Sequence, residues 1–107
     1  MKNELHIRRV IDGKVYDTDT ATCVHALSDD KGSIGLNFFV ERTNLYRTRR
    51  GQYFIAGESG AYRQWGQRYD GGYAPGRGLK LVTDAEAQRL LENSGGPVEQ
   101  FFDFAEG

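Results

Sequence analysis

Residues 36–57 read LNFFVERTNLYRTRRGQYFIAG, and this stretch decides the fold because two apolar runs flank a short polar segment. The apolar side chains are Phe38, Phe39, Val40, Leu45 and Tyr46 before that segment, and Tyr53, Phe54 and Ile55 after it. The polar segment, residues 48–52, contains Gly51, which can close a hairpin loop in the left-handed conformation without a Cβ penalty. The stretch therefore predicts two antiparallel strands, with Arg49 and Arg50 at the exposed tip of their loop.

A second hairpin is predicted near the start of the chain. Residues 5–11 form a short apolar run with imperfect alternation, and Asp12-Gly13 after it is a strong turn signal. Residues 14–16 then supply the returning strand.

A short helix is predicted over residues 20–27, with Thr18 and Asp19 in position to cap it. Its apolar side chains fall on one helical stripe: Ala21, Val24 and Leu27. Residues 28–35, SDDKGSIG, are rich in turn formers and are expected to connect this helix to the central hairpin.

The first arm of the central hairpin is expected to contain an irregularity. Phe38 and Val40 share one face of an extended strand, whereas Leu45 falls on the other face. A bulge near Thr43-Asn44 would return Leu45 to the core side.

The chain after the central hairpin alternates between strand and loop signals. Residues 61–65 predict a third strand of the sheet, and residues 79–82 predict the last strand. Between them, residues 66–78 read GQRYDGGYAPGRG and are rich in glycine. This composition predicts an exposed, mobile loop.

The last part of the chain predicts two helices. Thr83 to Glu86, TDAE, matches the capping box, and the first helix should end near Asn93-Ser94 because two glycines follow. Its inward side chains are expected to be Ala87, Leu90 and Leu91. Pro97 suits the first position of a second, shorter helix, whose apolar face would consist of Val98, Phe101, Phe102 and Ala105.

These elements together predict an α+β fold in one small domain spanning residues 1–107. We expect an antiparallel sheet of about four or five strands with two or three short helices. The helices over residues 20–27 and 83–93 should cover one face, because each has only one apolar stripe.

The composition sets limits on the class of protein. No window approaches the length of apolar sequence that a membrane span needs, and the first residues contain no apolar signal-peptide run. We therefore expect a cytoplasmic protein that does not bind membranes. The single cysteine, Cys23, excludes an internal disulfide and a cysteine-rich zinc site.

No catalytic, cofactor or metal site is predicted. His6 is expected in a strand and His25 in a helix, and Cys23 should point to a different side of that helix. The glycines near residue 76 match neither a phosphate-binding loop nor a dinucleotide fingerprint. We expect a protein that is not an enzyme.

Charge is distributed unevenly along the chain. Residues 47–80 contain seven Lys or Arg and two Asp or Glu, whereas residues 81–107 contain one and six. The basic middle also holds many aromatic side chains, and the residues singled out for partner binding are Arg47, Arg49, Arg50, Arg63, Trp65, Arg68, Tyr69 and Tyr73.

Three interpretations of this basic and aromatic segment remain open. Arginines among aromatics suit a groove that neutralises phosphates and stacks bases. The same residue types form hot spots in protein interfaces. They could also be structural, with Tyr53 and Trp65 in the core.

The acidic end of the chain offers an alternative binding surface. Glu99, Asp103 and Glu106 lie on the polar side of the predicted last helix. With Asp84, Glu86 and Glu92 they could imitate phosphates and occupy a DNA-binding groove.

Four segments resemble a group of small proteins from phages and bacterial mobile elements. They are residues 13–18 (GKVYDT) with Thr20-Ala21, residues 43–48 (TNLYRT), residues 51–60 (GQYFIAGESG) and residues 81–87 (LVTDAEA). The group's approximate pattern is GKxYDTxTA, TLYRTxxGxYFLxGExG and LTxxEA. Asn44 departs from this pattern and residues 66–78 have no clear counterpart, so binding specificity stays open.

Small mobile-element proteins of this kind include inhibitors of bacterial defence, among them anti-CRISPR proteins. The resemblance therefore implies a non-enzymatic inhibitor that occludes a surface of a bacterial defence nucleoprotein complex. The alternative is a small nucleic-acid-binding protein that uses the basic and aromatic surface. The motifs are structural, and they specify neither the target nor the oligomeric state.

Overall fold

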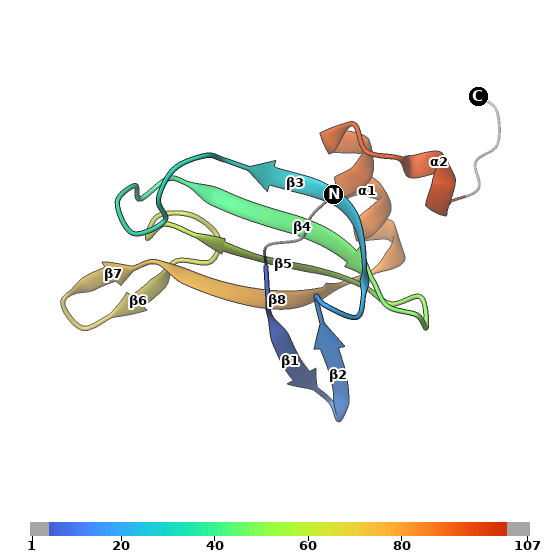
Figure 1. Cartoon of the computed structure of the whole chain (residues 1–107), viewed down its shortest axis with the longest axis horizontal. Helices are drawn as coiled ribbons and strands as arrows, with labels where there is room; N and C mark the ends of the chain where they lie inside the picture. The colour runs from blue at the N-terminus through green and yellow to red at the C-terminus, as the bar shows by residue number, and fades with distance from the viewer. Residues whose placement is uncertain (1–4, 103–107) are drawn as a thin grey trace.

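The computed structural model describes residues 5–102, and its centre is a four-stranded antiparallel sheet in the order β3-β4-β5-β8 (Figure 1). The strands of this sheet are β3 (Thr22–Asp29), β4 (Glu41–Arg47), β5 (Tyr53–Ser59) and β8 (Gly76–Val82). Two hairpins lie outside the sheet: β1 (Arg8–Ile11) with β2 (Lys14–Asp17), and β6 (Gln67–Tyr69) with β7 (Gly72–Ala74). The helices are α1 (Asp84–Ser94) and α2 (Val98–Phe101). The broad α+β expectation is confirmed.

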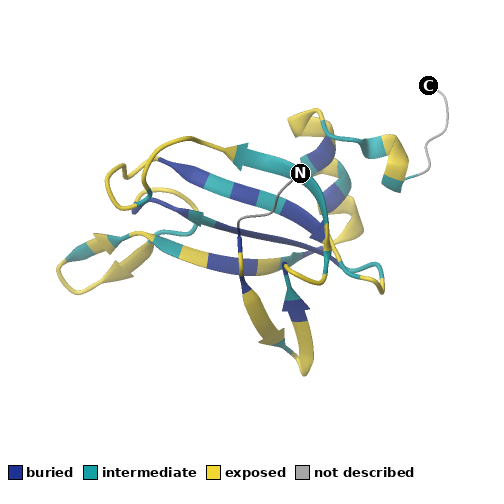
Figure 2. Ribbon diagram, in the orientation of Figure 1, coloured by how far each residue is buried: buried dark blue, intermediate teal, exposed yellow. Residues whose placement is uncertain are grey.

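The sheet is covered on both faces, and its two middle strands are the most deeply buried part of the fold (Figure 2). The N-terminal segment and β2 cover one face, in a cluster made of Leu5, Ile7, Tyr16, Tyr46, Phe54, Ala56 and Leu79. Helix α1 covers the other face, in a cluster made of Leu45, Tyr53, Ile55, Val82, Ala87 and Leu91. Successive residues of β4 and β5 point to opposite faces, so the same two strands supply both clusters.

The central hairpin has the predicted form. Residues 48–52 join β4 to β5, and Gly51 adopts a φ of +90°. The Thr48 amide donates to the Gln52 carbonyl at 2.9 Å, which closes the loop. β4 and β5 pair without a register shift, so the predicted bulge at Thr43-Asn44 is wrong.

The bulges lie in β3 instead, and they explain why the helix predicted over residues 20–27 is wrong. The β3–β4 register shifts between Cys23 and His25 and again between Ala26 and Ser28. The side chains at these two shifts, Val24 and Leu27, both pack toward α1. Their three-residue spacing imitates a helical stripe, but it arises from an extended strand with two bulges.

The predicted helix cap at Thr18 has another role. Its hydroxyl accepts from the Ile7 amide at 3.0 Å and donates to the Leu5 carbonyl at 2.9 Å. Thr18 is buried, so these bonds fix the N-terminal segment against the sheet. The first hairpin forms with Asp12 and Gly13 both at positive φ in its turn, as predicted. Its first strand begins only at Arg8, so the expectation of a strand from Leu5, with His6 in it, is wrong.

Two predictions after the central hairpin are wrong. Residues 61–65 form consecutive turns and no strand, because the chain must reverse beyond β5. Residues 66–78 are exposed for the most part, as expected, but they are not an irregular loop. They contain the hairpin β6–β7 and the start of β8, which is longer than the predicted residues 79–82.

The predicted capping box of α1 is confirmed. The Thr83 hydroxyl accepts from the Glu86 amide at 3.1 Å, and the Glu86 carboxylate accepts from the Thr83 amide at 3.0 Å. Gly95 ends the helix with a φ of +72°. Helix α2 is shorter than predicted, because Phe102 is already extended, and Ala105 lies outside the described residues. No helix within residues 5–102 is long and apolar enough to cross a membrane.

Replacing Thr83 with alanine should lower the free energy of unfolding by about 0.5–2 kcal/mol, because the capping hydrogen bond is lost. Urea denaturation followed by circular dichroism measures the change. Arg89→Ala, at an exposed position of the same helix, is the control and should change stability by less than about 0.5 kcal/mol. Equal stability of the two variants would contradict the capping role.

Candidate functional site

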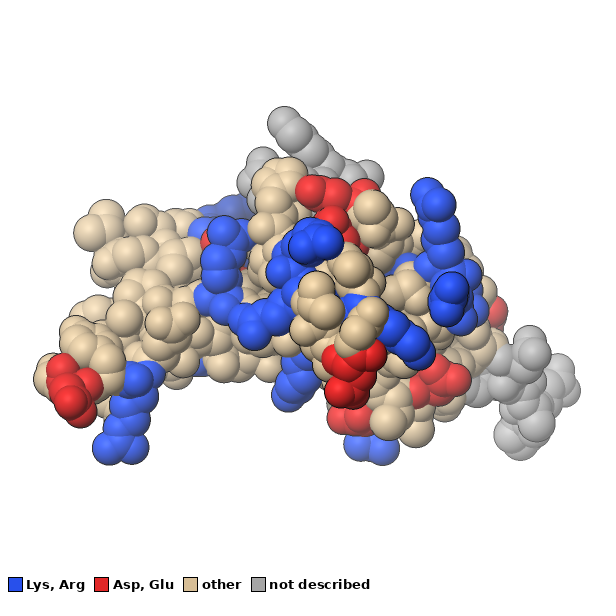
Figure 3. Space-filling model, turned by 90° about the horizontal axis from the view of Figure 1, so that it is seen from below, with Lys and Arg blue, Asp and Glu red and all other residues tan. Residues whose placement is uncertain are grey.

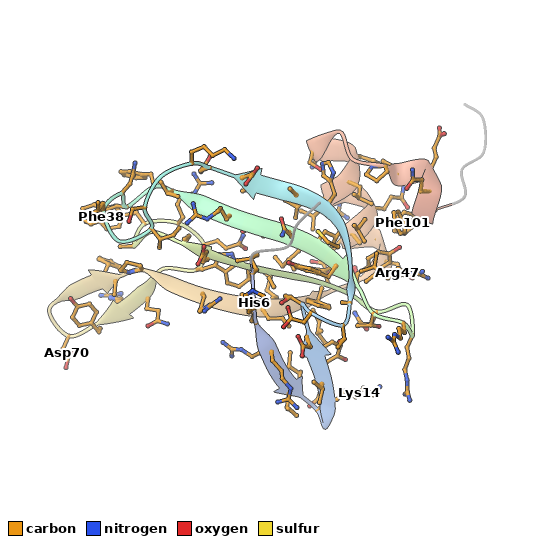
Figure 4. The ribbon with its side chains drawn as sticks, viewed as in Figure 1. His6, Lys14, Phe38, Arg47, Asp70 and Phe101 are labelled. Atoms are coloured by element: carbon orange, nitrogen blue, oxygen red, sulfur yellow. The ribbon has the colours of Figure 1, made fainter. Side chains whose placement is uncertain are left out.

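The basic and aromatic residues predicted to form one surface lie at opposite ends of the sheet (Figure 4). Arg49 and Arg50 occupy the β4–β5 loop, whereas residues 61–74 follow the other end of β5. A seven-residue strand at about 3.3 Å per residue separates these two regions. They cannot contribute to one compact groove.

Arg47 is the last residue of β4, and its guanidinium approaches Gly51 in the β4–β5 loop. Its guanidinium lies 5.7 Å from the centre of the Tyr53 ring, and Tyr53 stacks on Phe102 with 5.5 Å between ring centres. Tyr53 is buried in the α1 cluster. Arg47 therefore makes a cation–π contact with Tyr53, the ring on which Phe102 of the C-terminal segment packs.

An exposed aromatic cluster lies at the end of the sheet opposite Arg47. It consists of Phe38, Phe39, Tyr62 and Tyr73, which are 52%, 61%, 55% and 51% exposed. Tyr62 is the central ring, with centre distances of 5.1 Å to Phe38, 5.6 Å to Phe39 and 5.5 Å to Tyr73. Rings that pack on one another while half of each faces solvent form a continuous apolar patch, which is typical of an interaction site.

Sequence reasoning singled out only Tyr73 of this cluster for partner binding, and it placed Phe38 and Phe39 in a core strand. The strand begins only at Glu41, and the two rings lie in the preceding turns. One signal could have revealed this: Asn37 follows a turn-rich run, and its side chain accepts from the Phe39 amide at 2.9 Å. Asparagine commonly makes this turn-forming hydrogen bond two residues ahead.

Backbone contacts hold the two halves of the cluster together. The Tyr62 amide donates to the Phe38 carbonyl at 3.0 Å, and the Gly60 amide donates to the Val40 carbonyl at 2.8 Å. A Cβ at Gly60 would meet the Asn37 carbonyl and lie 2.6 Å from the Phe38 backbone. Glycine at this position therefore lets the two segments cross at close range.

A buried carboxylate, Glu41, organises the polar groups beneath the cluster. It accepts hydrogen bonds from Thr43 at 2.8 Å and from the Gln64 side chain at 3.1 Å. The Ser28 hydroxyl donates at 3.3 Å, and the Arg63 guanidinium lies 3.4 Å away. Burial raises the pKa of Glu41, but these hydrogen bonds and the Arg63 charge outweigh it and hold the pKa below its ordinary value.

Trp65 connects this network to the sheet. Its indole donates to the Thr43 hydroxyl at 2.9 Å, and its amide donates to the Ser59 hydroxyl at 2.9 Å. The ring lies over Gly57 and Gly78, which are paired across β5 and β8. Trp65 is thus half-buried and structural, although the sequence singled it out for partner binding.

The remaining predicted partner-binding residues lie around the cluster. Arg63 is 42% exposed at its side chain and also donates to the Phe39 carbonyl at 3.4 Å. Arg68 pairs in register with Tyr73 across the β6–β7 hairpin, and both are exposed. Tyr69 is 58% exposed and makes no ring contact within the described part of the chain.

The alternative acidic surface is only partly within the described residues. Glu99 is exposed on α2, while Asp103 and Glu106 lie outside the described residues. Asp84 and Glu86 are in the first turn of α1, where acidic side chains favour the helix start. Glu86 in addition completes the capping box, so its charge has a structural use.

The described residues bring together no group of three or more potential metal ligands. Cys23 lies in β3, where burial raises the pKa of its thiol, and the unreactive protonated form is favoured. His25 lies in the same strand and its ring packs beside Gly96. His6 contacts Asp19 at the surface, with 2.9 Å between the ring nitrogen and the carboxylate.

Substituting Glu41 with glutamine should lower the free energy of unfolding at neutral pH by about 1–3 kcal/mol. The glutamine NH2 group would face side chains that donate hydrogen bonds to the Glu41 carboxylate, so it would meet donors where an acceptor is needed. The depressed pKa of Glu41 means that its stabilisation is present above the ordinary value of 4.5 and is lost as pH falls through the folded-state pKa. The variant should therefore lose less stability than the wild type on acidification below that pH.

Urea denaturation at a series of pH values measures both effects. Glu58→Gln is the matched control, since Glu58 pairs with Arg42 on the other face of the sheet and its side chain is 29% exposed. It should cost at most about 1 kcal/mol. A Glu41 variant with wild-type stability and an unchanged acid profile would contradict the role of this carboxylate.

Replacing Gly78 with alanine should displace the indole of Trp65, because the added Cβ would lie 2.6 Å from its ring. The expected cost is about 1–3 kcal/mol. Trp65 is the single tryptophan of the chain, so its emission reports on the ring and should shift to longer wavelength. Gly35→Ala, where a Cβ meets only the Ser33 hydroxyl at 4.0 Å, should change neither quantity.

Comparison with known proteins identifies no relative of this chain. No protein-family model, no curated protein and no solved structure matches the chain.

Proposed function

We propose that this chain is a non-enzymatic binding protein that docks on a protein partner through the cluster of Phe38, Phe39, Tyr62 and Tyr73. The observation that carries the proposal is the exposure of four mutually packed rings at one end of the molecule. Aromatic side chains that are already packed lose little conformational freedom on binding. They are the residue types that dominate the energetics of protein interfaces.

The chemistry around the cluster favours a protein over nucleic acid. A strand of nucleic acid needs rings with open faces beside cations that meet its phosphates. Here the rings pack edge-on or tilted against one another, and one adjacent arginine, Arg63, already faces Glu41. Arg68 remains at the border of the cluster. The partner surface expected from this arrangement is an apolar pocket with an acidic residue at its rim.

Rigid presentation supports the same function. The segment that carries Tyr62 is tied to Glu41 through Gln64 and to the sheet through Trp65. These bonds fix the rings before a partner arrives, which reduces the entropy lost on association. The segment therefore has the order expected of a preformed docking surface.

The biological role we propose is inhibition of a bacterial defence complex, such as a CRISPR effector, by a protein of a phage or mobile element. Its support is the resemblance to small mobile-element proteins of residues 13–18 with Thr20-Ala21, residues 43–48, residues 51–60 and residues 81–87. Occlusion of a surface on the target is the mechanism, because a small binding protein without catalysis can inhibit by excluding the natural ligand. The acidic surface at Glu99 is less favoured, since Asp84 and Glu86, which the sequence analysis grouped with it, serve the start of α1.

Tyr62→Ala should weaken binding to the target about 30-fold or more, since it removes the ring that contacts the other three. The test has two parts. Phage plaquing on cells with an active CRISPR system should be restored by the wild-type protein, and calorimetry with the purified effector should give the affinity.

Tyr69→Ala is the matched control, because Tyr69 is equally exposed but lies outside the cluster. It should retain both restored plaquing and affinity. Equal loss in the two tyrosine variants would reject the cluster as the docking site. Failure of the wild type against every defence system assayed would reject the inhibitor role.

A further inference from the structure

A cleft lies between the β1–β2 hairpin and the β4–β5 loop, at the end of the sheet opposite the aromatic cluster. The β1–β2 turn and the β4–β5 loop form its walls, and its volume is about 740 Å³. Clefts of roughly 300–1,000 Å³ are of the size that holds a small-molecule ligand. The proposed protein-binding function does not use this cleft.

The cleft is cationic. Lys14 reaches it from β2, and Arg49 and Arg50 reach it from the β4–β5 loop. Within residues 5–102, none of these three side chains forms an ion pair. Figure 3, seen from the side of the β1–β2 hairpin, shows Lys and Arg side chains spread over this face, with Asp and Glu side chains among them.

One carboxylate, Asp17, also lines the cleft, against the three cations. It is half-buried, and one of its oxygens accepts from the Asp19 amide at 2.8 Å. This bond directs Asp17 to its own turn and leaves the balance of charge in the cleft positive. Lys14, Arg49 and Arg50 have no ion-pair partner within residues 5–102, so an anionic ligand would supply a counter-charge.

The backbone around the cleft is held in place while the cationic side chains are exposed. The Gln52 side chain donates to the Tyr53 carbonyl at 2.8 Å and to the Val82 carbonyl at 3.1 Å, which ties the loop base to β8. The Thr48 hydroxyl accepts from the Gln52 amide at 3.1 Å. Arg49 and Arg50 thus project from an anchored loop, and Figure 4 shows Lys14 near the tip of the other hairpin.

We propose that this cleft binds a ligand with two or more phosphate groups, held by Arg49, Arg50 and Lys14. A guanidinium matches the oxygens of a phosphate with two parallel hydrogen bonds, and a lysine adds a point charge. The one aromatic side chain in the cleft, Tyr16, is buried against Phe54 and has no open face for a base. Recognition therefore rests on phosphate, either of a free polyphosphate or nucleotide or of a nucleic-acid backbone.

The experiment titrates the full chain with inorganic tripolyphosphate by calorimetry and with a fluorescein-labelled single-stranded 12-mer by anisotropy, at two salt concentrations. At least one probe should bind, with an affinity that falls as salt is raised. Arg49→Glu with Arg50→Glu, and separately Lys14→Glu, should weaken binding tenfold or more. Arg49→Lys should retain part of it, because the charge remains while the bidentate geometry is lost.

Arg68→Glu is the matched control, an arginine that is also exposed and lies at the other end of the molecule. It should bind as the wild type does, and circular dichroism should show that every variant is folded. Binding of tripolyphosphate alone identifies a free polyphosphate as the ligand. Binding of the 12-mer that tripolyphosphate displaces identifies a nucleic-acid backbone.

Two results would overturn the proposal. One is the absence of binding to either probe by the wild type at low salt. The other is an equal loss of binding in Arg68→Glu, which would show general charge attraction without a site. Neither result bears on the aromatic cluster, because Tyr62→Ala leaves all three cleft cations in place.

Discussion

The hydrogen bonding of the Glu41 carboxylate is the constraint on which the loop end of the molecule depends. A buried carboxylate must find donors, since an unpaired one costs several kcal/mol. The donors here come from β3, from β4 and from the turns after β5, through Ser28, Thr43 and Gln64. Three segments distant in sequence therefore meet at one group. Their meeting places Tyr62 against Phe38 and Phe39, and so creates the surface assigned to the partner.

The sheet joins the two ends of the molecule into one unit. β4 and β5 contribute alternate residues to the cluster under α1 and to the cluster under the N-terminal segment. Removing either layer would expose one apolar face of the same two strands, so the layers support each other through the sheet.

The features that could be predicted from the sequence are those fixed by local chemistry. Asp12-Gly13, Gly51 and the Thr83 capping box each determine their own backbone geometry, and all three are as predicted. The helix assigned to residues 20–27 failed because pairing with β4 overrides a spacing that bulges imitate. The prediction of one joint surface was wrong because the length of the strand between them places Arg49 and Tyr73 far apart, and sequence composition does not reveal that distance. The prediction that Phe38 and Phe39 lie in a core strand was wrong because apolar residues are usually buried, and these two are exposed.

The bulges of β3 also affect how molecules of this protein meet one another. β3 is an eight-residue edge strand of the sheet. An edge strand normally offers a continuous row of free amides and carbonyls, with which a strand of another molecule can pair. In β3 the register breaks twice, so that its pairing with β4 is divided into runs of two residues. A regular extended strand of another molecule cannot form a continuous row of hydrogen bonds with such an edge strand. The same irregularity that hides β3 from pattern analysis thus makes this edge of the sheet a poor template for an intermolecular sheet.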